Sequence, residues 1–248
     1  MTAPSRLVLR EIHSRPPEIK LGTSGWWVRL IQQILIERGM LIHKTGFMDD
    51  STLTALGKFR AARGIREGSV CGPVTWAHLA IDDEEMILYV PLREAFLGAT
   101  EIEKNNWGPW VRKYTGGLEG ERWAWCAAFA TWCLRQFERD SKRPGYKLLI
   151  KERYSSSRIF KEADNKHLLR SDPHPGDLAL IKGGPTKYRH TALVSHYDAK
   201  GKLLWVIEGN VRANRIPWKW FPNMKRPLDG VRIGCYKPGS YVIVGTGV

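Results

Sequence analysis

Hydrophobic residues recur at every third or fourth position shortly after the start of the chain, which is the spacing of a helix with one buried face. The stretch that begins at Val28 follows this pattern, and Gly39 stands where a glycine commonly ends a helix. The predicted buried face consists of Val28, Ile31, Ile34 and Leu35.

Two further helices are predicted before residue 81. The second begins at Asp50 or Ser51, either of which can cap the first turn with its side chain, and it ends at Gly64. The third begins near Pro73, because proline is favoured in the first turn of a helix, and it ends near Ala80. The pattern therefore predicts an all-α, three-helix bundle in this part of the chain.

A run of four acidic residues at 82–85 follows, and four like charges in a row resist burial and mark a predicted boundary. Helical spacing over 88–98 and 126–138 comes next. Five short segments with the alternation of strands then complete the chain, and helices followed by antiparallel strands predict an α+β domain. These segments are 177–181, 190–197, 203–210, 231–237 and 241–248.

With 248 residues, the chain is long enough for two modest domains. The changes in pattern predict an N-terminal arm over residues 1–17 and a helical domain over residues 18–80. A linker with a connecting helix is predicted over residues 81–104, and an α+β domain with an antiparallel sheet over residues 105–248.

The chain is strongly basic: 39 Lys and Arg against 25 Asp and Glu give a net charge of +14. An excess of this size suits an anionic partner, and we expect contact with anionic polymers of a cell envelope. The basic residues are spread along the chain without a dense block, so we expect no specific binding to nucleic acid.

No hydrophobic stretch reaches the roughly 18 residues of a membrane-spanning helix, and the start of the sequence lacks the apolar core of a secretory signal. We therefore expect a protein that is made in the cytoplasm without a signal peptide and does not span a membrane. We also expect a monomer.

The candidate nucleophile is Cys126, at the start of the helix predicted over residues 126–138. Unpaired N–H groups and the helix dipole favour a negative charge at that end, so we expect a lowered thiol pKa. A buried core cysteine is the alternative, and it is the interpretation that we favour for Cys71, Cys133 and Cys235. The four cysteines include no CxxC pair, so we expect all of them to be reduced.

A thiolate used in hydrolysis needs a base within reach and a group that orients the base. His190 is the candidate base, because it begins a predicted strand directly after a glycine-rich loop. In the next predicted strand, alternation places Glu208 and Asn210 on one face. Glu208 can accept the imidazole N–H, and Asn210 can support that pair or donate to an oxyanion. Taken alone, the Glu-Gly-Asn segment is better explained as a hairpin turn.

Together these motifs resemble the cysteine, histidine-dependent amidohydrolase/peptidase (CHAP) family over about residues 105–240. The residues that carry the resemblance are Cys126 at a helix start, Pro175-Gly176-Asp177 before an apolar strand, His190, and Glu208-Gly209-Asn210. The resemblance implies a papain-like fold. It also implies that Cys126 is the nucleophile, His190 the base, Glu208 its orienting residue and Asn210 an accessory polar residue.

The stretch before Cys126 lacks the closely spaced aspartates of calcium-binding members of that family. We therefore expect no bound metal, and no cofactor is implied. The pair His190-Thr191 stands where a small residue plus valine is frequent in the family, and this departure is mild.

Residues 18–80 resemble the three-helix peptidoglycan-binding domain of bacteria. The matching landmarks are Gly22-Thr23-Ser24-Gly25, Gly46-Phe47, Gly64-Ile65 and Gly72-Pro73, followed by Thr75-Trp76. The resemblance implies a non-catalytic module that holds the protein on peptidoglycan. Trp26 and Trp27 are candidate contacts to sugar rings, although either could instead cover the core, and Trp125 is a third candidate substrate contact.

The two resemblances imply a wall hydrolase of the phage endolysin type, which cleaves an amide bond of peptidoglycan and reaches the wall or periplasm after release from the host cytoplasm. The bond is either the one that joins the glycan to the stem peptide or one within the peptides. The alternatives are a bacterial or secretion-system-delivered wall hydrolase and a non-catalytic peptidoglycan-binding protein. A zinc hydrolase is disfavoured because the sequence has no HExxH motif.

Overall fold

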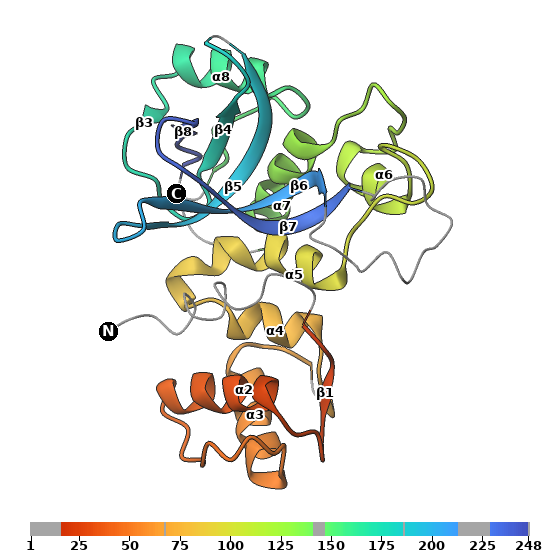
Figure 1. Ribbon diagram of the computed structural model, residues 1–248, viewed down its shortest axis with the longest axis vertical. Helices are drawn as coiled ribbons and strands as arrows, with labels where there is room; N and C mark the ends of the chain where they lie inside the picture. The colour runs from red at the N-terminus through yellow and green to blue at the C-terminus, as the bar shows by residue number, and fades with distance from the viewer. Residues whose placement is uncertain (1–15, 67, 141–146, 186, 213–228, 248) are drawn as a thin grey trace. The chain divides into compact units, whose positions relative to one another are not determined.

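The computed structural model describes residues 16–66, 68–140, 147–185, 187–212 and 229–247. The chain divides into two compact units, Met1–Tyr89 and Val90–Val248 (Figure 1). The division falls inside the segment over which the linker was predicted. Of the predicted N-terminal arm, residues 1–15 lie outside the described residues.

The N-terminal unit contains α-helices at the three predicted positions, together with two very short strands that the sequence pattern did not reveal. The two strands pair antiparallel, with Ile19 opposite Cys71. The elements are β1 (Ile19–Lys20), α2 (Trp26–Glu37), α3 (Asp50–Ala62), β2 (Val70–Cys71), α4 (Pro73–Leu79) and the 3-10 helix η1 (Asp83–Leu88).

The predicted face of α2 is buried, and a polar side chain on the same helix joins the loop before α3 to the core. Gln32 is fully buried, and its Nε2 lies 3.0 Å from the Phe47 carbonyl oxygen and 3.0 Å from Thr52 Oγ1. Its Oε1 accepts the Gly46 N–H at 2.7 Å. A buried amide costs free energy unless it is satisfied, so these bonds fix the loop against the helices.

One local expectation for this unit needs correction. The cap of α3 is Asp49, whose Oδ1 accepts the Thr52 N–H at 2.7 Å, rather than Asp50 or Ser51. The acidic run at 82–85 has a structural use as well, because Asp82 and Glu85 form a reciprocal capping box at the start of η1.

The C-terminal unit combines helices with one six-stranded sheet, so the α+β prediction with an antiparallel sheet is confirmed. The strand order is β3-β8-β4-β5-β6-β7, and all neighbours in it are antiparallel. The helices are α5 (Tyr89–Leu97), α6 (Pro109–Thr115), α7 (Cys126–Asp140) and α8 (Ser156–Asn165). The strands are β3 (Leu169–Arg170), β4 (Leu178–Lys182), β5 (Tyr188–Asp198), β6 (Leu203–Arg212), β7 (Asp229–Tyr236) and β8 (Tyr241–Val244).

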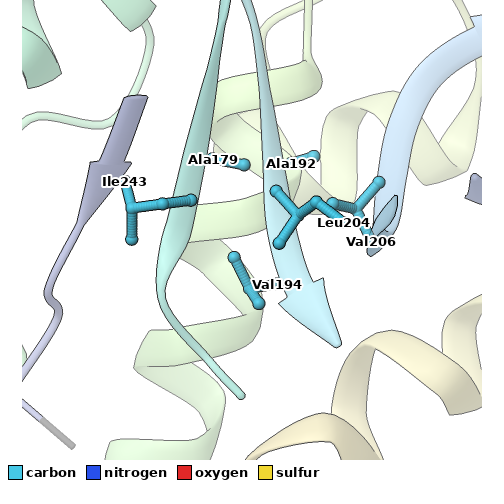
Figure 2. Close-up of a cluster of buried hydrophobic side chains, with 6 residues drawn as sticks. All are labelled: Ala179, Ala192, Val194, Leu204, Val206 and Ile243. Atoms are coloured by element: carbon cyan, nitrogen blue, oxygen red, sulfur yellow. The ribbon is translucent and has the colours of Figure 1, made fainter. Parts of the chain in front are cut away.

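Helix α7 packs against β5 and β6, the two strands that carry His190 and Glu208. A core cluster on the sheet contributes side chains from β4, β5, β6 and β8 (Figure 2). Since alternate residues share a face, Val206 lies on the same side of β6 as Glu208, and Ala192 on the same side of β5 as His190. The cluster therefore anchors the two strands that present these polar side chains. Its members are Ala179, Ala192, Val194, Leu204, Val206 and Ile243.

Within the described part of the chain, every helix is too short or too polar to cross a bilayer.

Candidate active site

Cys126 is the first residue of α7, and its sulfur lies among hydrogen-bond donors. The Trp125 carbonyl accepts the Phe129 N–H at 2.8 Å, which starts the helix directly before the cysteine. The backbone N–H groups of Ala127 and Thr191 hydrogen-bond the sulfur, and so does the His190 side chain. The residue is free of any disulfide and 6% exposed. Its surroundings are those of a stabilised thiolate.

His190 stands near the start of β5 and bridges the thiol to a carboxylate. Its Nε2 lies 2.9 Å from Glu208 Oε2, across the β5–β6 pair. With Nε2 engaged by the carboxylate, Nδ1 is the ring nitrogen left for the hydrogen bond with Cys126. The imidazole is therefore held between the two groups.

The pKa shifts of Cys126 and His190 agree on the position of the shared proton. Burial alone would raise the pKa of the Cys126 thiol, but the hydrogen bond and the positive charge of His190 lower it below its usual 9.0. Burial would lower the pKa of His190, but hydrogen bonds to Cys126 and Glu208 raise it to about 10. Both shifts favour a thiolate beside an imidazolium over the neutral pair.

Glu208 is fully buried on β6 and accepts hydrogen bonds on both carboxylate oxygens. Besides His190, its donors are Arg232 Nε, 2.8 Å from Oε1, and the Tyr236 hydroxyl, 2.7 Å from Oε2. Burial would raise the pKa of the Glu208 carboxyl, but the bond to His190 and the charges of His190 and Arg232 lower it. The carboxylate is therefore ionised next to the imidazolium.

Sequence reasoning missed Arg232 and Tyr236. The signal was present in alternation: both residues occupy one face of β7, and Arg232 stands directly opposite Glu208 in the register. Without the strand pairing, however, an arginine and a tyrosine in the last part of a basic chain have nothing to distinguish them.

The predicted shared face of Glu208 and Asn210 needs correction, because the strand is irregular between them. The pairing of β6 with β7 shifts register between Glu208 and Val211, and Asn210 has a φ of 59°. Gly209 approaches α7 so closely that an added Cβ would lie 2.6 Å from the Trp125 ring. The bulge ends the simple alternation on which the prediction rested. The accessory role of Asn210 stays a prediction.

The expectation that Trp125 contacts a substrate needs correction. Trp125 is fully buried, and its indole N–H donates to Glu101 Oε1 at 3.2 Å. Its contribution is to pack against Phe129, with ring centroids 6.3 Å apart, and so to support the start of α7.

The other two candidate tryptophans differ from each other. Trp26 is 48% exposed at the start of α2. Trp27 is half-buried, and its ring packs edge-on against Trp76 at 5.6 Å. Trp76 is fully buried, as expected of a core residue. Of the three, Trp26 has the ring that is most available to a ligand.

The remaining histidines and cysteines near the site are placed differently. His196 is buried and stacks on Trp205, and His174 is exposed beside Asp172. Cys133 lies buried in α7, where burial raises its thiol pKa, and Cys71 is buried as well. Cys235 on β7 is exposed, so the expectation of a buried core cysteine there is wrong. Across the described ranges, no three His, Cys, Asp or Glu side chains converge in a way that could hold a metal ion.

Comparison with known proteins agrees with this geometry. Residues 117–210 match the family model described as CHAP domain, and the match contains Cys126, His190 and Glu208. Proteins of this family are cysteine- and histidine-dependent amidohydrolases and peptidases that act on peptidoglycan. No curated protein and no solved structure matches the chain.

Proposed function

We propose that the protein is a peptidoglycan hydrolase whose C-terminal unit cleaves an amide bond with Cys126 as nucleophile. The observation that carries the proposal is the hydrogen-bonded row of Cys126, His190 and Glu208. This is the arrangement of an activated thiol nucleophile, its base and the group that orients the base. The CHAP match supports peptidoglycan as the substrate.

The reaction follows from the resting charges. The Cys126 thiolate attacks the amide carbonyl carbon, and backbone N–H groups at the start of α7 stabilise the oxyanion. His190 gives its proton to the nitrogen as the C–N bond breaks, which leaves a thioester and a free amine. The neutral His190 then takes a proton from water, the hydroxide attacks the thioester, and the carboxylic acid leaves with regeneration of the thiolate.

The N-terminal unit is proposed to hold the enzyme on the wall. Trp26 offers an exposed aromatic face, and a cavity of about 400 Å³ opens between the end of α3 and the start of α4. Arg60, Arg66 and His78 are among the residues that line this cavity. Tethering raises the concentration of a linked catalytic unit at an insoluble substrate. We further propose that the whole chain serves as an endolysin, which reaches the wall after release from the cell that makes it.

The direct test is digestion of purified sacculi, with mass spectrometry of the soluble products. New free amines would support the proposal, and the product masses would show whether the bond to the glycan or a peptide bond was cut. New reducing sugar ends without new amines would instead indicate a glycosidase. Binding without release of products would indicate a non-catalytic wall-binding protein.

Glu208→Gln is expected to lower kcat on the order of 10²-fold or more, because an imidazole without its carboxylate partner loses the correct orientation and proton position. Since Glu208 helps to raise the pKa of His190, the alkaline loss of activity should move below its parental position near pH 10. The measurement is the pH dependence of product release. Glu119→Gln, which removes a carboxylate paired with Arg112, is the matched control and should behave like the parent.

Trp26→Ala is expected to weaken binding to sacculi about two- to tenfold, as the loss of one exposed aromatic contact of about 0.5–1.5 kcal/mol implies. Cosedimentation with sacculi measures the binding, and hydrolysis of a soluble muropeptide should stay unchanged. Leu41→Ala is the control, because Leu41 is the most exposed of the large hydrophobic side chains described in this unit, at 101%. Equal binding by the parent and both variants would remove Trp26 from the proposed wall contact.

A further inference from the structure

Three alternate residues of β7 surround the carboxylate of Glu208. Arg232 Nε donates to Oε1 at 2.8 Å, and the Tyr236 hydroxyl donates to Oε2 at 2.7 Å. Between them, Gly234 faces the same carboxylate. All three lie beyond residue 210, where the match to the CHAP model ends.

Gly234 makes room for the carboxylate rather than serving a turn. A Cβ at this position would lie 2.5 Å from Glu208 Oε1, which is closer than two such atoms can approach. The oxygen cannot simply swing away, because Arg232 and His190 hold the two ends of the carboxylate. The missing side chain of Gly234 is therefore part of what lets Glu208 reach its position.

The buried negative charge of Glu208 explains why these contacts from β7 are needed. A fully buried carboxylate is costly unless it is paired and hydrogen-bonded. The groups that face it are His190 from β5 and Arg232 and Tyr236 from β7, with Cys126 of α7 on the far side of His190. Each of the three contacting groups stabilises the ionised form, and only one of them, His190, belongs to the reacting pair.

We propose that Arg232, Gly234 and Tyr236 are positioning residues that hold Glu208 ionised and aimed at His190, and that through this carboxylate they set the pH range in which Cys126 is a thiolate. The inference rests on the proposed function only in taking Cys126 and His190 as the reacting pair. It extends the working site to a fourth element, β7, and it defines the pattern Arg-x-Gly-x-Tyr as part of that site.

The expected direction follows from the contacts. Removing a donor to Glu208 makes its carboxylate easier to protonate, so the negative charge beside His190 is lost at a higher pH than in the parent. A less stabilised imidazolium in turn stabilises the thiolate less. We use the term acid limb for the pH below which the thiolate is lost. It should therefore move to higher pH in every variant that weakens the contacts of Arg232, Gly234 or Tyr236 with Glu208.

The experiment follows alkylation of Cys126 by iodoacetamide as a function of pH, with the peptide that contains Cys126 quantified by mass spectrometry. This readout needs no substrate, and peptide mapping separates Cys126 from the exposed Cys235. The variants are Tyr236→Phe, which removes only a hydroxyl, Arg232→Gln and Gly234→Ala. Tyr241→Phe is the control, because Tyr241 is another half-buried tyrosine that packs against the sheet core.

Tyr236→Phe and Arg232→Gln are each expected to raise the acid limb by about one pH unit. Both should also lower kcat on purified sacculi about tenfold or more, with KM little changed. Arg232→Lys should shift the acid limb less than Arg232→Gln does, because lysine keeps the positive charge but lacks the planar Nε donor. Tyr241→Phe should leave the limb in place.

An acid limb that stays at the parental pH in both Tyr236→Phe and Arg232→Gln overturns the inference, whatever happens to the rate. A lower rate with an unshifted limb would mean that these residues only support the fold. If the acid limb shifts as expected while the parent releases nothing from sacculi, the positioning role of Arg232 and Tyr236 is supported and the proposed substrate is wrong. The two failures are therefore distinguishable.

Discussion

Cys126→Ala is expected to abolish release of amines from sacculi, with a loss of about 10³-fold or more, because no other group in the site can form the thioester. Binding to sacculi should stay at the parental level, because Cys126 lies in the C-terminal unit, whereas the proposed wall contact lies in the N-terminal unit. Product release and cosedimentation measured on the same preparation check both statements.

Cys133→Ala is the matched control for that experiment. It removes a second thiol from the same helix, but this thiol is buried and burial raises its pKa, so it carries no thiolate near neutral pH. We expect nearly full activity and a modest loss of stability from the small cavity, about 1 kcal/mol. If the two alanine variants keep equal activity, Cys126 is not the nucleophile and the proposed chemistry is wrong.

His190→Ala should be as damaging as loss of the thiol, for a reason that the pKa shifts supply. The hydrogen bond and charge of His190 are what lower the pKa of the Cys126 thiol against the effect of burial. Without them the thiol is protonated near neutral pH, and the leaving amine has no proton donor. Activity should fall about 10³-fold or more, and alkylation of Cys126 at neutral pH should fall with it.

The parent provides a second measurement for His190. Its imidazole must be protonated to release the amine, and its pKa is raised to about 10, so activity should persist well above neutral pH and decline as the pH passes through about 10. His174→Ala is the control variant, because the His174 ring is exposed and forms its ion pair with Asp172. An alkaline decline close to the ordinary histidine pKa would contradict the raised value.

Much of the C-terminal fold could be predicted from the sequence, because its strands alternate clearly and each predicted segment overlaps an observed strand. The pairing of His190 with Glu208 was implied by the resemblance to the CHAP family, because the pattern alone favours a turn at Glu208. Short elements escaped prediction. Helix α6 has seven residues, about two turns, and β3 has only two residues, so neither repeats its pattern often enough to be recognised.

The errors at the site have a common physical origin in tertiary contacts. Alternation failed at Asn210 because β6 bulges where Gly209 approaches Trp125, and a bulge has no signature in the order of apolar and polar residues. Trp125 was a candidate substrate contact, yet it is fully buried and Glu101 gives its indole N–H a buried partner. Arg232 and Tyr236 became recognisable only when the register of β7 against β6 was known.

The place of β7 in the sheet bears on how the protein would lose activity on heating. It is the last strand in the order β3-β8-β4-β5-β6-β7, and its ladder partner is β6. An outer strand detaches at a lower free-energy cost than a central one, which is held on both sides. The carboxylate that keeps the imidazole charged is thus fastened to an outer strand, whose far side is bridged through Gly230 to Thr100 and through the Val231 N–H to the Ala99 carbonyl. We therefore expect heating to cost activity through fraying at this margin before the central strands and the helix that bears the thiol come apart.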